Sequence, residues 1–111
     1  MKRVILAAAL LVTASTAAAA QTAAPANPNS TAGLVGKSEA EVRRRLGDPA
    51  IARREAGGAM WTYREEACAL FVFFKAQGRE GLRVSGAAAG PRKRGQPTLD
   101  TDQCIAAAAK S

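Results

Sequence analysis

The chain of 111 residues has no histidine, only two cysteines and few aromatic residues. Histidine is the commonest general base and the commonest metal ligand, so its absence excludes Ser-His and Cys-His catalytic pairs. A phosphate-binding loop is also missing, because Gly57-Gly58 is not followed by Lys and then Ser or Thr. We therefore expect no catalytic residue, no metal site and no cofactor, and a protein that is not an enzyme.

Two acidic clusters give no better case for catalysis or metal binding. Asp100-Thr101-Asp102 lacks the glycine and the distal glutamate of a calcium-binding loop, and helix capping accounts for it. Glu65 and Glu66 are adjacent, so in a strand they would point to opposite faces. A solvated turn is the better interpretation of this pair.

The chain also lacks an apolar run of the ~20 residues that a membrane-spanning helix needs. It starts instead with Lys2 and Arg3, an uncharged apolar stretch over residues 4–12 and small residues up to Ala20. This order is typical of a secretory signal peptide and predicts cleavage between Ala20 and Gln21; an uncleaved anchor is the alternative. We expect a periplasmic or secreted protein with no transmembrane segment after cleavage.

Cleavage would leave one domain behind a linker. Residues 21–32 contain two prolines and no large apolar side chain, so they cannot bury enough surface to offset the entropy lost on ordering. We therefore divide the chain into a signal peptide over residues 1–20, a flexible linker over residues 21–32 and a folded domain over residues 33–111.

Positive charge exceeds negative charge along the chain. The net charge is +7, and it falls to +5 without Lys2 and Arg3. This excess favours an anionic lipid head group or an acidic envelope protein as partner, whereas export argues against nucleic acid. The alternative is that the excess charge only maintains solubility.

The first predicted element is a helix over Glu39–Leu46. Ser38 and Glu41 form a capping box at its start. Gly47 and Pro49 end it, the first as a left-handed cap and the second because proline cannot continue a helix.

Alternating side chains predict strands over residues 50–55, 59–64, 67–75 and 81–85, the first two joined by a turn at residues 56–58. The third strand has apolar residues on both faces, which is typical of a central strand or of a strand covered on both sides. Residues 86–97 are rich in Ala, Gly and Pro and predict a solvated loop. A second helix, capped by Asp100, follows over residues 104–110.

The two cysteines are predicted to form a disulfide, since two cysteines in an exported chain most often do. Cys68 lies on the third strand and Cys104 in the first turn of the last helix. The bond would hold an alanine-rich helix that packs weakly by itself. The predicted fold is thus α+β: one N-terminal helix, an antiparallel meander of three to four strands, and a C-terminal helix packed on the sheet through a disulfide.

Two groups of residues are candidates for partner binding. Trp61 and Tyr63 share one face of a strand, where large aromatic residues belong either to the core or to a recognition patch. The basic run Arg92, Lys93 and Arg94 is the second group, and a solvated loop is its alternative interpretation.

Four features occur in a fixed order: Gly36, the capped helix with Val42, the turn Leu46-Gly47-Asp48-Pro49, and Trp61-x-Tyr63. In this order they resemble the envelope proteins of the SmpA/OmlA (BamE-like) family. The resemblance implies a small α+β domain with helices on an antiparallel sheet, and one member of that family is a lipoprotein subunit of the machine that inserts outer-membrane β-barrels. The lipid-bearing cysteine of that family has no counterpart here.

Together these features predict an exported, non-enzymatic binding or scaffolding module of the bacterial cell envelope, linked to outer-membrane assembly or integrity. It would hold a protein partner on an exposed face or edge of its sheet. The helix-plus-sheet layout is also similar to that of secreted β-lactamase-inhibitor proteins. The alternative function is a secreted binder or inhibitor that recognises an anionic lipid or an acidic protein through a basic surface, formed by Arg92–Arg94 together with Arg43–Arg45.

Overall fold

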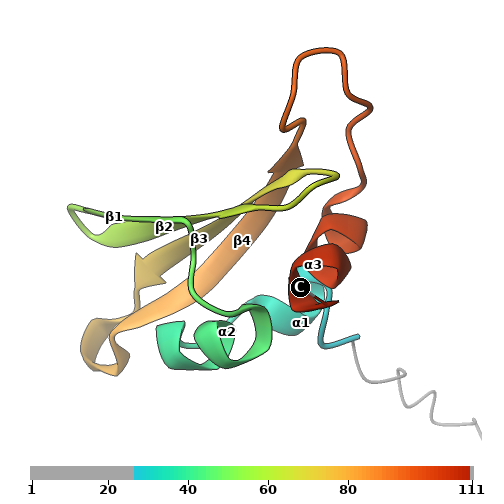
Figure 1. The fold of residues 1–111 in the computed structure, drawn as a ribbon. Helices are drawn as coiled ribbons and strands as arrows, with labels where there is room; N and C mark the ends of the chain where they lie inside the picture. Colours follow the sequence, from blue (N-terminus) through green and yellow to red (C-terminus); the bar gives the residue numbers. More distant parts are fainter. Residues whose placement is uncertain (1–26, 111) are drawn as a thin grey trace, which may run out of the picture.

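A computed structural model describes residues 27–110 as a four-stranded antiparallel sheet with helices on one of its faces (Figure 1). The predicted signal peptide, its cleavage site at Ala20 and Gln21, and residues 21–26 of the predicted linker lie outside the described residues. The elements in chain order are α1 (Thr31–Leu34), α2 (Glu39–Leu46), β1 (Ile51–Glu55), β2 (Gly58–Arg64), β3 (Ala69–Ala76), η1 (Gly78–Glu80), β4 (Leu82–Gly90) and α3 (Thr101–Lys110).

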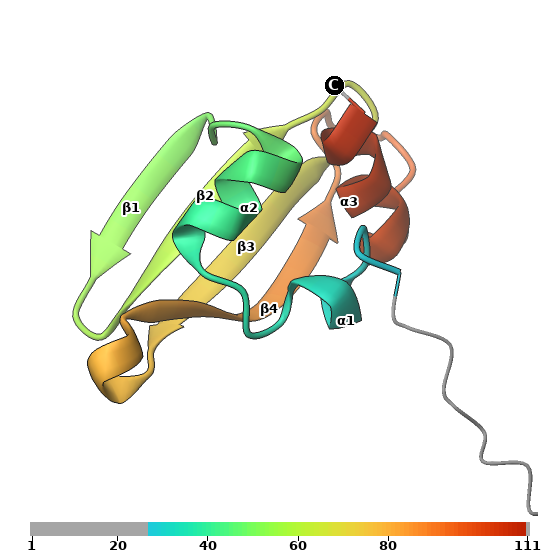
Figure 2. The same ribbon diagram turned by 90° about the horizontal axis from the view of Figure 1, so that it is seen from below.

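The α+β class and the layout predicted from the sequence are confirmed. The strands follow each other in the order β1-β2-β3-β4, each antiparallel to the next, so the sheet is a simple meander. Seen from the helix side, α2 lies over β2 and β3, whereas α3 lies beside the end of β4 (Figure 2). None of the helices within residues 27–110 is long and apolar enough to cross a membrane.

Helix α2 has the bounds predicted from its caps. The Ser38 hydroxyl accepts a hydrogen bond from the amide of Glu41 at 3.2 Å, which satisfies one of the free donors at the helix start. At the other end Gly47 has φ of +82°, a conformation that favours glycine. Val42 and Leu46 are buried against the sheet, so the helix is held by its apolar face rather than by its own propensity.

Strand β4 is longer than predicted. Residues 86–90 were expected to belong to a solvated loop, but they continue β4 and pair with β3 as far as Gly90 opposite Ala69. Ala87 and Ala89 pack against the core from this segment. Ladder hydrogen bonds and core contacts therefore override the low strand propensity of Ala and Gly.

The folded part also begins earlier than the boundary set at residue 33. Thr31 and Ala32 belong to α1, and the buried Ser30 caps this helix by accepting from the amide of Gly33 at 3.1 Å. The amide of Thr31 donates to Asp102 of α3 at 2.9 Å. Leu34 is fully buried, so residues 30–34 are part of the domain and not of a linker.

The predicted disulfide is confirmed. Cys68 lies immediately before β3 and Cys104 in α3, with 6.1 Å between their Cα atoms and both side chains fully buried. Ile105 is also fully buried beside Cys104. The bond therefore fixes α3 to the sheet at the centre of the core.

Candidate functional site

The helices leave one face of the sheet uncovered by the described residues. Trp61, Leu70, Val72 and Phe74 point to the helix side and are buried. Because neighbouring side chains alternate between the two faces of a strand, the residues between them point to the opposite side. We call this side the open face; its residues include Ile51, Arg53, Met60, Thr62, Arg64, Ala69, Phe71 and Phe73.

The strand register arranges the open face in rows across the sheet. One row contains Ile51, Thr62, Phe71 and Ala88, and the next contains Arg53, Met60, Phe73 and Gly86. Ile51 and Phe73 are each 38% exposed, which is high for large apolar side chains. The open face therefore presents accessible apolar side chains on β1 and β3, whereas Thr62 between these strands is buried.

Positive charge flanks these apolar side chains. Arg64 ends β2 at one end of the open face, whereas Lys75 and Arg83 pair across β3 and β4 at the other. Glu55 lies in line with Lys75 and Arg83 at the outer edge. The open face thus combines accessible apolar side chains with a mainly basic rim, and it suits a partner with apolar and acidic groups.

A hollow with a volume of about 490 Å³ opens at the Arg64 end of the open face. Carbon surfaces line most of it and come from Ile51, Ala69, Phe71 and Pro91. Its polar groups belong to Thr62, Arg64 and Arg92. No acidic side chain lines it, so nothing within the hollow offsets the charge of the two guanidinium groups.

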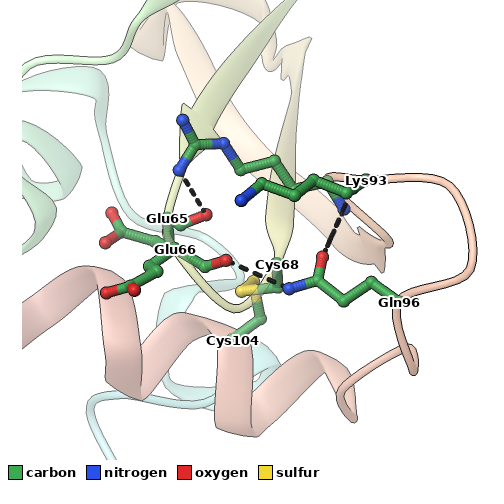
Figure 3. Close-up of a disulfide and its surroundings, with 7 residues drawn as sticks. Glu65, Glu66, Cys68, Lys93, Gln96 and Cys104 are labelled. Atoms are coloured by element: carbon green, nitrogen blue, oxygen red, sulfur yellow. Dashed lines mark hydrogen bonds between the residues drawn. A yellow bond between two sulfur atoms is a disulfide. The ribbon is translucent and has the colours of Figure 1, made fainter.

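The loop that follows β4 is anchored to the turn between β2 and β3. Arg92 donates to the carbonyl of Glu65 at 3.3 Å, and the Gln96 amide donates to the carbonyl of Glu66 at 3.1 Å. Figure 3 shows Gln96 reaching Glu66 beside the Cys68–Cys104 disulfide. The basic run therefore belongs to a positioned loop, although Arg92, Lys93 and Arg94 are all exposed.

The prediction of a partner-binding patch at Trp61 and Tyr63 is wrong. Only 2% of Trp61 and 3% of Tyr63 is exposed, because α2 covers this side of β2. Trp61 packs on Phe74 with 4.7 Å between ring centroids, and the Arg43 guanidinium lies 5.0 Å from the Trp61 ring centroid. Both aromatic residues belong to the core, which was the other interpretation of their pattern.

Burial also shifts the pKa of Tyr63. Its hydroxyl donates to the carbonyl of Gly47 at 2.8 Å, where α2 ends. Desolvation raises the pKa of Tyr63 far above its ordinary value, and although Arg43 lowers this pKa, Asp48 raises it further. Tyr63 therefore stays a neutral hydrogen-bond donor, with a structural role.

The second basic cluster predicted to join the Arg92–Arg94 run does not do so. Arg43 forms a salt bridge with Asp48 at 2.9 Å, and Arg45 donates to the carbonyls of Pro28 and Gly33 at 3.2 Å. These arginines lie on α2, on the helix side of the sheet, whereas the loop after β4 rises from the opposite side (Figure 1). The structure therefore does not form one continuous basic surface from the two runs.

The sequence predicted docking on an exposed sheet face or edge, but it did not identify the residues of the open face as the site. The signal was present in the alternation of Phe71 and Phe73 with core residues, a pattern that fits either a central strand or a strand covered on both sides. β3 is indeed central, between β2 and β4, but the described residues cover it on one side only. The hollow could not be predicted because Arg92 reaches it only through the extension of β4.

Compared with protein-family models, curated proteins and solved structures, the chain matches none of them. Within residues 27–110, no group of three or more Cys, Asp or Glu side chains is placed to hold a metal ion. The case for a function therefore rests on the geometry of the open face, and the resemblance to the SmpA/OmlA family stays a prediction.

Proposed function

We propose that this chain is an exported, non-enzymatic binding or scaffolding module of the bacterial cell envelope, which holds a protein partner on the open face of its sheet. The single observation that supports the proposal is the exposure of Phe73 and Ile51 on a sheet face that no described element covers. Clustered apolar side chains on a protein surface commonly mark a docking site.

The chemistry of the open face supports a protein partner. Met60, Phe71 and Phe73 supply flexible and aromatic apolar surface, which is enriched at protein interfaces. The flanking arginines would pair with acidic residues at the edge of the partner. The free edge of β1 is a poorer docking site, because Arg53 and Arg54 oppose pairing with another strand.

The disulfide supports the proposed location. Disulfides form and persist in oxidising compartments, such as the bacterial periplasm, and are rare in the cytosol. Together with the predicted signal peptide, the Cys68–Cys104 bond makes a periplasmic or secreted protein the best proposal. The link to outer-membrane assembly rests on the SmpA/OmlA resemblance.

Site-specific photocrosslinking in the producing cells tests the proposal. A photoreactive amino acid at Phe73 should give one discrete crosslinked protein band, because this position lies at the centre of the open face. The same amino acid at Arg44, which is exposed on α2 on the other side, serves as the control. No discrete band at Phe73, or the same band at both positions, would contradict docking on the open face.

The exposed loop supports a second candidate function, the recognition of an anionic lipid surface. Arg92, Lys93 and Arg94 are held together in one positioned loop, so their charges add locally. Sedimentation with anionic vesicles should then fall steeply as salt increases, because salt screens the attraction. Replacing the three residues by glutamine should abolish it, and salt-independent sedimentation would argue against this function.

A further inference from the structure

We propose that the hollow at the Arg64 end of the open face is a small-molecule site that binds a monocarboxylate with an unbranched apolar chain, the chemistry of a fatty acid. This inference goes beyond docking of a protein, since the ligand is a free amphiphile and the site is only one end of the open face. A volume of about 490 Å³ lies within the range of about 300–1,000 Å³ that is usual for ligand pockets.

The polar end of the site consists of two arginines without an acidic partner. Among the described residues, neither Arg64 nor Arg92 belongs to a salt bridge. Arg92 is held in place through one nitrogen, Nη1, which donates to the carbonyl of Glu65. Its other guanidinium donors make no hydrogen bond with the described residues. These donors are therefore free to bind a carboxylate, whose two oxygens match the paired N–H groups of an arginine.

The rest of the hollow is suited to the apolar chain of the ligand. Ile51 and Phe71 form its floor, with Ala69 and Pro91 beside them. Ile51 is 38% exposed, so a bound chain would remove apolar surface from water. A purely ionic ligand such as inorganic phosphate would leave this surface uncovered, whereas an amphiphile uses both parts of the site.

The strand register gives the ligand a direction. Arg64 lies two residues from Thr62 on β2, and Thr62 lies two residues from Met60. Rows two residues apart are separated by about 6.7 Å, so the apolar surface extends about 13 Å from the Arg64 row to the row of Met60 and Phe73. A carboxylate held at Arg64 and Arg92 would therefore lay its chain over Phe71 toward Phe73.

Titration of the purified, oxidised protein with decanoate, below its micelle concentration, tests the site by amide chemical-shift mapping. We expect saturable shifts that cluster at Thr62, Ala69 and Phe71. Decanol, which has the same chain without the charge, should bind at least roughly tenfold more weakly, because it cannot form the charge-assisted pair. Equal binding of decanol, shifts confined to the helix side, or no saturation would overturn the proposal.

Arginine variants make the test specific. Arg64→Gln and Arg92→Gln should each weaken decanoate binding roughly fivefold to tenfold. Arg44→Gln removes the same charge from the exposed side of α2 and should leave binding unchanged. If all three variants weaken binding equally, the attraction is nonspecific and the site is refuted. Decanoate binding does not depend on a protein partner, so failure of crosslinking at Phe73 and failure of this site are distinguishable.

Discussion

The Tyr63 hydroxyl joins strand β2 to the end of α2 by a hydrogen bond. It donates to the carbonyl of Gly47 at 2.8 Å from an almost fully buried position. Tyr63→Phe keeps the ring and removes only this hydrogen bond, so the free energy of unfolding should fall by about 1 kcal/mol. Urea denaturation followed by tryptophan fluorescence measures the change, and an unchanged midpoint would show that the hydrogen bond contributes nothing.

The same residue predicts a dependence of stability on alkaline pH. Burial raises the pKa of Tyr63 in the folded state, whereas the unfolded chain ionises near its ordinary value of 10.0. The folded state therefore holds the proton where the unfolded state loses it, and stability falls as the pH rises above 10. Tyr63→Phe should flatten this fall relative to the unmodified protein. Because the chain has one tyrosine, phenolate absorbance reports its ionisation directly.

At the scale of a secondary-structure element, the close approach of β2 to β3 depends on Gly58, the first residue of β2. A Cβ atom added there would lie 2.6 Å from the carbonyl oxygen of Phe74, a backbone atom that cannot move freely. Gly58→Ala should therefore destabilise the fold by about 2 kcal/mol through overpacking. Gly86→Ala is the matched control in β4, since its added Cβ meets nothing within 4 Å. It should change stability by less than about 1 kcal/mol, and equal losses for both variants would contradict the steric explanation.

How well the sequence predicted each element depended on whether local groups or distant contacts determine it. The bounds of α2 were predictable because local groups define them: the Ser38 hydroxyl at one end and the left-handed Gly47 at the other. Strand β4 was predicted too short because Gly86 and Ala88 have little strand propensity of their own, and pairing with β3 supplies the order. The short helix α1 depends on Asp102, which is 71 residues away along the chain from Thr31.

Helix α3 depends on its disulfide more than a helix with large apolar residues would. Cys104, Ile105 and Ala108 are its buried side chains, and only Ile105 among them is large. Replacing both Cys68 and Cys104 by alanine opens a link across 36 residues, which should cost about 3–4 kcal/mol in the chain-entropy model. Hydrogen exchange should then accelerate first in α3 and only later in β2 and β3. If exchange accelerates equally in all elements, or does not accelerate, then α3 depends on the disulfide no more than the rest of the fold does.

At the scale of the whole molecule, the alternation of side chains gives one sheet two chemically different faces. The helix side supplies stability through Trp61 and Phe74, and the open face presents Phe73 and the hollow beside Phe71. The sequence allowed both sets to be predicted as strand residues, but not which set the helices cover. That choice depends on where α2 and α3 pack, and hence on tertiary contacts that local patterns do not encode.

Phe73 and Phe74 are neighbours on opposite faces of β3, so substituting each of them compares the two faces in one experiment. Phe74 is 4% exposed and packs on Trp61, so Phe74→Ala should cost about 3–5 kcal/mol of stability by leaving a cavity. Phe73 is 38% exposed and therefore only partly buried, so Phe73→Ala should cost less, about 1–2 kcal/mol. Thermal or urea unfolding measures both changes.

The Phe73→Ala variant should also lose binding of a partner on the open face. If the open face is the docking surface, Phe73→Ala should remove the crosslink formed from a photoreactive residue at Met60, its cross-strand neighbour, while the protein stays folded. Because the protein stays folded, the loss would come from the missing contact rather than from unfolding. A Phe73→Ala protein that unfolds as readily as Phe74→Ala would instead make Phe73 a core residue and remove the basis for docking on this face.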